Sequence, residues 1–146
     1  MPVPADINPR IVEALYGEAL VLADALRHRF GGEFGPCGDA AAHVALSCEG
    51  LRATTRTMHS LAWLLNHRAY FAGEISEFQL RRHGRLPAAT ASENLALLPA
   101  DAAQLVRLSE RLFARVERLE KAWRGDGAGD RPSAIERLRD RLAAAG

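Results

Sequence analysis

A stretch without proline, residues 39–86, carries side chains that repeat at a spacing of seven. Two interleaved columns make up this repeat, the first being Val44, Leu51, Met58 and Leu65, and the second Cys48, Thr55, Ala62 and Ala69. Alternating steps of four and three residues put both columns on one side of an α-helix, as in a coiled coil, and the small residues of the second column let a neighbouring helix come close. The spacing predicts one long helix over residues 39–72 with this seam buried against its neighbours.

The boundaries of this helix are marked by local signals. Asp39 is suited to cap the first free backbone N–H groups, and Gly73 is suited to end the helix. Gly50 lies inside it and costs about 1 kcal/mol relative to alanine, so we expect a close backbone approach or a slight bend there.

A first helix is predicted over residues 9–30. Asn8 can cap it, and Pro9 fits the first helical position because its missing N–H is not needed there. Gly31 and Gly32 follow its end, where glycine commonly adopts a left-handed conformation. The apolar residues expected on its buried side are Ile11, Leu15, Ala19, Leu22, Leu26 and Phe30.

A third long helix is predicted after Pro99, over residues 100–124. Its apolar stripe comprises Leu105, Leu108, Leu112, Val116, Leu119 and Trp123. On its outer side, the pairs Glu117–Lys121 and Glu120–Arg124 have the favourable order four residues apart. We interpret these charges as a solvated face.

Two segments connect or follow the long helices. Residues 74–99 form a connection in which Ser76 caps a short turn through Arg82, and its length indicates a functional or mobile segment. Residues 125–146 begin as a glycine-rich linker and end with Ile135, Leu138 and Leu142 at helical spacing. A helix of about 12 residues is marginal unless it docks, so we expect a flexible or conditionally helical tail.

Together these elements predict the all-α class. The expected architecture is an antiparallel three-helix bundle with a long central helix over residues 1–124, followed by the tail 125–146. A length of 146 residues suits a single core of this kind.

Composition restricts the partners and the compartment. The 19 basic and 18 acidic residues nearly balance, so the chain has no bulk field for nucleic acid or anionic membranes. No secretion signal or membrane-spanning stretch appears, and we expect a cytoplasmic protein. Cys37 and Cys48 lack a CxxC spacing, so we interpret them as packed, reduced thiols.

The long helix carries a second stripe, of arginine, histidine and aromatic residues. It comprises Arg52, Arg56, His59, Trp63, His67 and Tyr70. Such side chains recur at protein interfaces because they combine wide apolar contact with directed donors. Two interpretations stay open: a contact surface for a partner, or aromatic core residues beside solvated arginines.

Catalytic and metal chemistry are not indicated. His59 and His67 lie eight residues apart, whereas two ligands on one helix face chelate best at a spacing of four. Ser47, Ser60, Thr54 and Thr55 lack a base at helical reach in a pattern that would form a pocket, and Thr54 and Thr55 are expected to bond back to carbonyls one turn earlier. The sequence therefore predicts neither an enzyme nor a metal site or cofactor.

A basic segment gives an alternative function. Arg81, Arg82 and Arg85 lie in the connection after the long helix, where they could contact phosphates. Without a second basic cluster, this is a weak footprint for a small transcriptional regulator that touches DNA. An acidic protein partner, or solvent, suits the segment better.

The central helix resembles that of the RcdA family, the regulators of CtrA degradation in alphaproteobacteria. The likeness covers most of the chain up to Trp123, with a later run "LSERLFARVERLEKAW". The matching positions are Thr54, Thr55, Arg56, Met58, Trp63, Leu64, Leu65, Arg68, Ala69, Gly73 and Glu74.

This resemblance implies a small, homodimeric helical adaptor without chemistry of its own. Family members are taken to deliver cell-cycle regulators to the ClpXP protease beside a receiver-domain protein, which raises the local concentration of cargo. Family tails are thought to contribute, which would suit residues 125–146. A structural dimer without an adaptor role is the remaining alternative.

Overall fold

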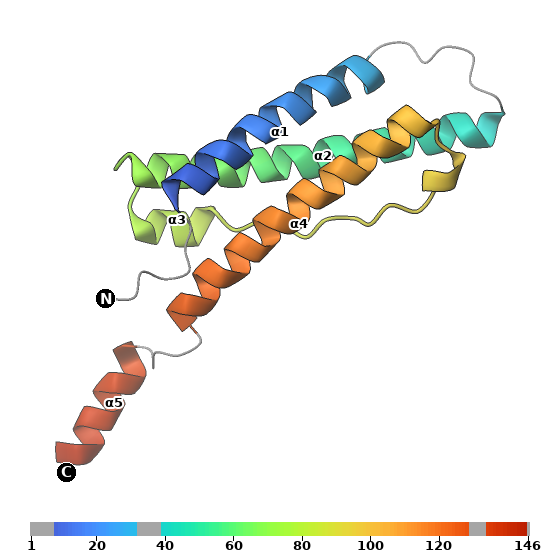
Figure 1. Cartoon of the computed structure of the whole chain (residues 1–146). Coiled ribbons are helices and arrows are strands. Elements are labelled where there is room, and N and C mark those ends of the chain that lie inside the picture. Colours follow the sequence, from blue (N-terminus) through green and yellow to red (C-terminus); the bar gives the residue numbers. More distant parts are fainter. Residues whose placement is uncertain (1–7, 32–38, 129–133, 146) are drawn as a thin grey trace.

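The computed structural model describes residues 8–31, 39–128 and 134–145, and within these ranges the regular elements are all helices, with no strand. The elements are α1 (Pro9–Phe30), α2 (Ala40–Phe71), α3 (Glu77–His83), the 3₁₀ turn η1 (Leu95–Leu97), α4 (Ala100–Ala128) and α5 (Ala134–Ala145). Helices α1, α2 and α4 pack on one another, with α2 in contact with both of the others (Figure 1). The predicted all-α class is confirmed.

Local capping sets the ends of α1 and α2 where the sequence places them. The side chain of Asn8 accepts a hydrogen bond from the backbone N–H of Arg10, and that of Asp39 accepts one from Ala42. Gly73 follows α2 with a φ of 77°, the left-handed conformation that glycine adopts readily. Gly31, by contrast, ends α1 with a φ of −87°, so the left-handed ending expected there is wrong; Gly32 lies outside the described residues.

Gly50 marks a close contact between α1 and α2. A Cβ atom added at this glycine would lie 2.5 Å from Cδ1 of Phe30, the last residue of α1. The predicted close approach at Gly50 is therefore confirmed, and it explains why α2 tolerates a helix-weakening residue in its interior.

The seam of α2 that we predicted to be buried is exposed to solvent. Its large members are solvent-exposed, with exposed fractions of 58% for Val44, 70% for Leu51, 55% for Met58 and 46% for Leu65. Cys48, Thr55 and Ala62 are exposed beside them, so Cys48 is not the packed thiol we expected; Cys37 lies outside the described residues. The side of α2 that faces α1 and α4 carries a different set, which comprises Leu46, Ala53, Ser60, Leu64 and His67.

The apolar stripes of α1 and α4 are confirmed in most positions and wrong in two. In α1, Val12 takes the fully buried place expected for Ile11, which is 42% exposed. In α4, Leu112 and Val116 are buried, whereas Leu108 is exposed. Helix α4 also extends four residues beyond its predicted end at residue 124, to Ala128.

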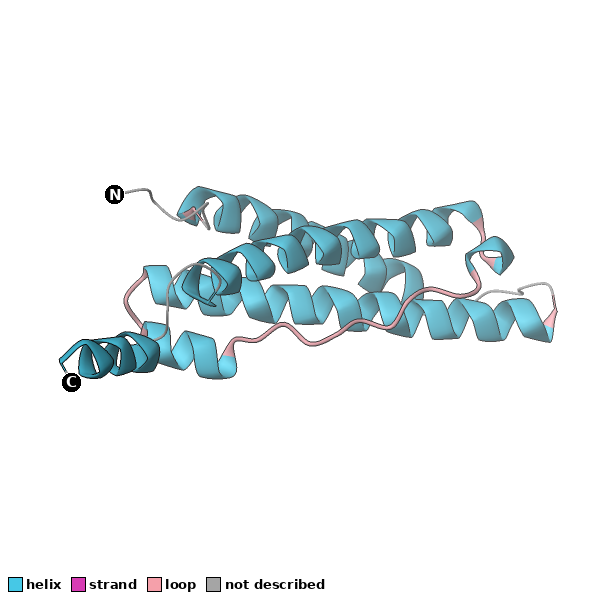
Figure 2. Cartoon of the chain, turned by 90° about the horizontal axis from the view of Figure 1, so that it is seen from below, coloured by secondary structure: helices cyan, strands magenta, loops and turns pink. Residues whose placement is uncertain are grey.

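The connection between α2 and α4 is partly ordered by α3. Ser76 caps α3 through a capping box, in which its hydroxyl accepts from the N–H of Gln79 and the Gln79 amide oxygen accepts from the N–H of Ser76. The next residues, 84–94, form an extended segment without regular structure that runs along the packed helices to η1 (Figure 2). We call residues 84–94 the strap.

Helix α5 stands apart from the packed helices. Among the described residues it contacts none of the other elements (Figure 1). Leu138 and Leu142 on its surface are exposed. The side chain of Ile135 lies outside the described residues. A helix is thus present at the predicted place, and among the described residues it packs on no other helix.

Candidate protein-binding surface

The arginine, histidine and aromatic stripe of α2 points into the molecule. Arg56, Trp63 and His67 are at least 97% buried, and the other three members, Arg52, His59 and Tyr70, are half-buried. Buried side chains cannot reach a partner, so the interpretation of this stripe as an external contact surface is wrong for Arg56, Trp63 and His67. Their role in the fold is set by the residues that they contact.

Trp63 joins α2, α4 and the strap. Its indole Nε1–H donates to Oε2 of Glu120 at 2.9 Å, and the same oxygen accepts from the backbone N–H of Leu86 at 2.6 Å. Glu120, which we predicted on a solvated face, is therefore a buried acceptor. The indole ring also stacks on His67, with ring centroids 3.7 Å apart.

Arg56 of α2 links α4 to the C-terminal part of the strap. Its guanidinium donates to Oγ of Ser109 at 2.8 Å and, on the strap, to the carbonyl of Thr90 and Oγ of Ser92, both at 3.1 Å. Ser92 in turn donates to Glu110 at 2.6 Å. Burial lowers the pKa of Arg56, although nearby carboxylates, Glu110 first, act against that effect.

Glu49 is a buried residue that the sequence analysis missed. Its carboxylate accepts from Arg52 at 2.8 Å and from the backbone N–H groups of Glu93 at 3.0 Å and Asn94 at 3.4 Å. Burial raises the pKa of Glu49, but these hydrogen bonds hold it below its ordinary value. The only signal in the sequence is Glu49 one turn before Arg52, a pattern that is common on solvated helix faces.

His67 is a buried histidine held neutral. Its Nδ1–H donates to the carbonyl of Trp63 at 3.1 Å, and its Nε2 is buried without a hydrogen-bond partner among the described residues. Burial, with a contribution from the positive charge of Arg124, lowers the pKa of His67 from 6.5 to about 4. A proton added to Nε2 would give His67 a buried positive charge, and the new N–H would have no acceptor among the described residues.

The stability of the protein is therefore expected to fall with acidification. Between pH 6.5 and 4 the unfolded chain binds a proton at His67 that the folded chain does not, so the free energy of unfolding decreases as the pH falls through this window. From pH 7 to pH 5 the expected loss at this residue is about 2 kcal/mol. Urea unfolding at a series of pH values measures it, with His67→Phe as the control.

His67→Phe keeps an aromatic ring on Trp63 and removes the titrating group. We expect its unfolding free energy to change less between pH 7 and pH 5 than that of the parent, by about the amount assigned to His67. Equal pH dependence of the two proteins would contradict a neutral, buried His67.

The outer face of α2 is the candidate binding surface. We define it by its exposed seam residues, Val44, Cys48, Leu51, Thr55, Met58, Ala62 and Leu65. From residue 44 to residue 65 it extends for ~32 Å along the helix. Among the exposed residues of α2 from position 40 to position 65 there is no Asp, Glu, Lys or Arg.

The outward side of α4 provides the contrast. Its exposed residues are mostly charged and include Asp101, Arg107, Arg111, Arg115, Arg118 and Lys121. A solvated helix face usually looks like that of α4, because charged side chains keep their hydration there. An exposed face with an apolar seven-residue repeat and no charge is typical of a helix that packs against another protein surface.

The basic segment is partly engaged within the fold. Arg81 pairs with Glu77 at 3.0 Å and lies over the ring of Trp123, with its guanidinium carbon 4.3 Å from the centroid. Arg82 and Arg85 are exposed. Only two of the three arginines thus offer an open contact for phosphate or for an acidic partner.

Neither a metal site nor a membrane-spanning helix is found among the described residues. In residues 8–31, 39–128 and 134–145, no three histidine, cysteine, aspartate or glutamate side chains gather in a way that could hold a metal ion. No helix within these ranges is long and apolar enough to cross a membrane.

Comparison with known proteins finds one family. A family model described as "Protein of unknown function (DUF1465)" matches residues 4–145. No curated protein and no solved structure matches the chain.

Proposed function

The chain belongs to the DUF1465 family, and we propose that it is a non-enzymatic adaptor that forms a homodimer through the outer face of α2. In this proposal α1, α2 and α4 form an antiparallel three-helix bundle, and two bundles meet along α2. The observation that carries it is the uncharged, apolar face described above, which is exposed in the single chain.

A second copy of the same chain suits this face better than solvent does. The seam alternates large residues with small ones, so knobs such as Leu51 and Met58 can fit beside Cys48, Thr55 and Ala62 of a second α2. A face that is complementary to itself satisfies the two-fold symmetry of most homodimers. The absence of charge removes the desolvation cost that buried ions would impose.

The cellular role follows from the resemblance to the RcdA family. It implies that the dimer delivers cell-cycle regulators to the ClpXP protease in the cytoplasm, with a receiver-domain protein as a further partner. Two copies of each contact surface in one particle would raise the effective concentration of cargo at the protease. The tail helix α5, with Leu138 and Leu142 exposed, is a second and looser contact in this proposal.

The test of the dimer is a charge placed on the outer face. We expect Leu51→Glu and Met58→Glu to weaken self-association by about a hundredfold each, because an unpaired carboxylate would be buried at the interface. Sedimentation equilibrium measures this as a shift from twice the chain mass of 15.9 kDa toward that mass. Both residues are more than half exposed, so we expect the fold of the single chain to be retained.

Val21→Glu is the matched control, because Val21 is an apolar residue of α1 that is 72% exposed and lies away from the outer face of α2. It should leave the mass unchanged. A parent protein that sediments at the mass of one chain at all concentrations, or glutamate variants that remain dimeric, would show that α2 is not the interface.

The adaptor role is tested separately by binding to purified ClpX from an alphaproteobacterium. Surface plasmon resonance should detect binding by the parent dimer, and Leu51→Glu should weaken it through the loss of bivalent attachment. A dimer that does not bind ClpX would leave the structural dimer as the better description.

A further inference from the structure

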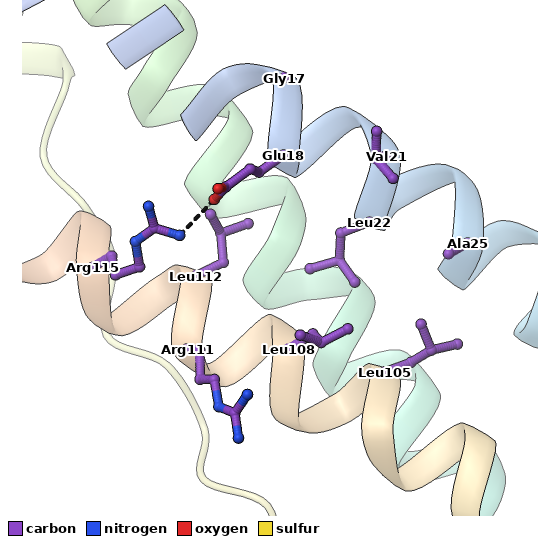
Figure 3. A pocket seen from close by; sticks show the side chains of 10 residues that line it. All are labelled: Gly17, Glu18, Val21, Leu22, Ala25, Leu105, Leu108, Arg111, Leu112 and Arg115. Carbon is purple, nitrogen blue, oxygen red and sulfur yellow. Dashed lines mark hydrogen bonds and ion pairs between the residues drawn. The ribbon is translucent and has the colours of Figure 1, made fainter. Parts of the chain in front are cut away.

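A second apolar feature, a groove between α1 and α4, has no part in the proposed dimer. It has a volume of about 600 Å³. Leu22 of α1 faces Leu105, Leu108 and Leu112 of α4 across it, and Val21 stands at its rim (Figure 3). The groove exists because α1 and α4 each contact α2 more extensively than they contact each other.

The groove is open to solvent along its length. Val21 is 72% exposed and Leu108 is 37% exposed, so apolar carbon is in contact with water at both edges. Gly17 on the α1 side has no described atom of another element within 4 Å of the place where a Cβ would be. Glycine weakens a helix interior, and no other described element fills the space beside Gly17. Gly17 therefore leaves room for an incoming chain to approach the backbone of α1.

The α4 edge of the groove is basic. Arg107, Arg111, Arg115 and Arg118 are exposed and follow one another at steps of three or four, so they line one side of the helix. Arg115 pairs with Glu18 of α1 at 2.5 Å and closes one end of the groove (Figure 3). Among the described residues, no carboxylate pairs with Arg107, Arg111 or Arg118.

We propose that the α1–α4 groove binds an amphipathic helix of a partner protein whose apolar stripe is bordered by glutamate or aspartate on the side facing α4. The apolar floor of the groove would pack against the apolar stripe of the partner helix, and the unpaired arginines would pair with its acidic border. This inference rests on the proposed adaptor function for its cellular meaning, because it supplies the chemistry of one partner. It concerns a different surface from the dimer, so the two can fail independently.

The chain's own α5 is a poorer occupant. Leu138 and Leu142 could enter the groove, but Arg139 and Arg141 border that stripe and Asp140 lies on the opposite side of the helix. Like charges would then meet along the α4 edge, which opposes docking. Charge complementarity therefore favours an acidic helix from elsewhere.

The test uses two labelled synthetic peptides and the full-length protein. Both peptides are about five helical turns long, ~18 residues, with leucines at i, i+3, i+4 and i+7. One has glutamates beside the stripe and the other has lysines at the same positions. Fluorescence anisotropy should show the glutamate peptide binding about tenfold more tightly than the lysine peptide, and the difference should shrink with added salt.

Two variants locate the binding in the groove. Gly17→Leu places a side chain in the open space beside α1 and should weaken binding of the glutamate peptide by about tenfold. Arg111→Glu should weaken the glutamate peptide and strengthen the lysine peptide, because the charge of the edge is reversed there. Such a reversal of preference is not expected from damage to the fold.

Matched controls lie elsewhere on the chain. Gly125→Leu fills open space at a second helical glycine, and Arg82→Glu reverses an exposed arginine of α3, so both should leave peptide binding unchanged. Leu51→Glu should also leave it unchanged even where it dissociates the dimer, which separates failure of the groove from failure of the proposed function.

Three results would overturn the proposal. The first is equal affinity for the two peptides, and the second is unchanged affinity in Gly17→Leu. The third is binding that appears only when Leu138 and Leu142 are both replaced by glutamine, because the groove would then belong to α5 of the same protein.

Discussion

Replacing Trp63 with alanine is expected to lower the free energy of unfolding by about 3–5 kcal/mol. Trp63 is 2% exposed and fills the space between α2 and α4, so its removal leaves a cavity that the surrounding helices can close only in part. It also removes the indole donor from Glu120, whose carboxylate is then buried with one partner fewer. Urea unfolding followed by circular dichroism measures the loss.

Trp63→Phe separates the two causes. A phenyl ring can keep the contact with His67, while the hydrogen bond to Glu120 is lost, so we expect a smaller loss of about 1–3 kcal/mol. Folded Trp63→Ala protein should remain dimeric, because Trp63 lies on the side of α2 opposite the outer face. A change of less than 1 kcal/mol in Trp63→Ala, or a monomeric but otherwise stable variant, would contradict the internal position of this residue.

Replacing Glu49 with alanine is expected to cost about 3 kcal/mol of unfolding free energy and to loosen the strap. The variant leaves the backbone N–H groups of Glu93 and Asn94 without their acceptor, and it leaves the guanidinium of Arg52 with only the longer contact to the Glu93 carboxylate, at 3.5 Å. Because Glu93 lies in the strap, cleavage after it by endoproteinase Glu-C should become faster. Denaturant unfolding and timed proteolysis with mass spectrometry measure the two effects.

Two variants make the Glu49 experiment specific. Glu49→Gln keeps an amide oxygen that can still accept from the strap, so it should be less damaging than Glu49→Ala. Glu74→Ala removes an exposed glutamate and should change the unfolding free energy by no more than about 0.5 kcal/mol. Equal resistance to cleavage after Glu93 in Glu49→Ala and the parent would mean that Glu49 does not hold the strap.

The sequence indicated the candidate interface only as a repeating pattern of apolar residues. The seven-residue repeat through Val44 and Leu65 correctly identified one continuous side of α2, but not what covers it. The opposite side is also rich in large residues, among them Leu46, Trp63 and Leu64. When both sides of a helix are apolar, periodicity cannot say which of them meets the rest of the same chain.

The buried polar residues were missed for a related reason. Glu49 and Arg56 are charged residues of the kind that a helix normally presents to solvent, but both lie on the buried side of α2, where they form hydrogen bonds with the strap and, for Arg56, also with α4. The acceptors of Arg56, on Thr90, Ser92 and Ser109, lie 34 to 53 residues away in the chain. Sequence patterns over one or two helical turns carry no information about such partners.

The sequence by itself determined the helices of this protein and most of their ends. Asn8, Asp39, Ser76 and Gly73 act within one turn of their own positions, so their effects are independent of how the helices later pack. The tertiary structure alone decided which side of α2 became core, which polar side chains the strap buries, and that a groove opens between α1 and α4. These features depend on the relative placement of distant segments, and that placement is set by the packing of the whole chain.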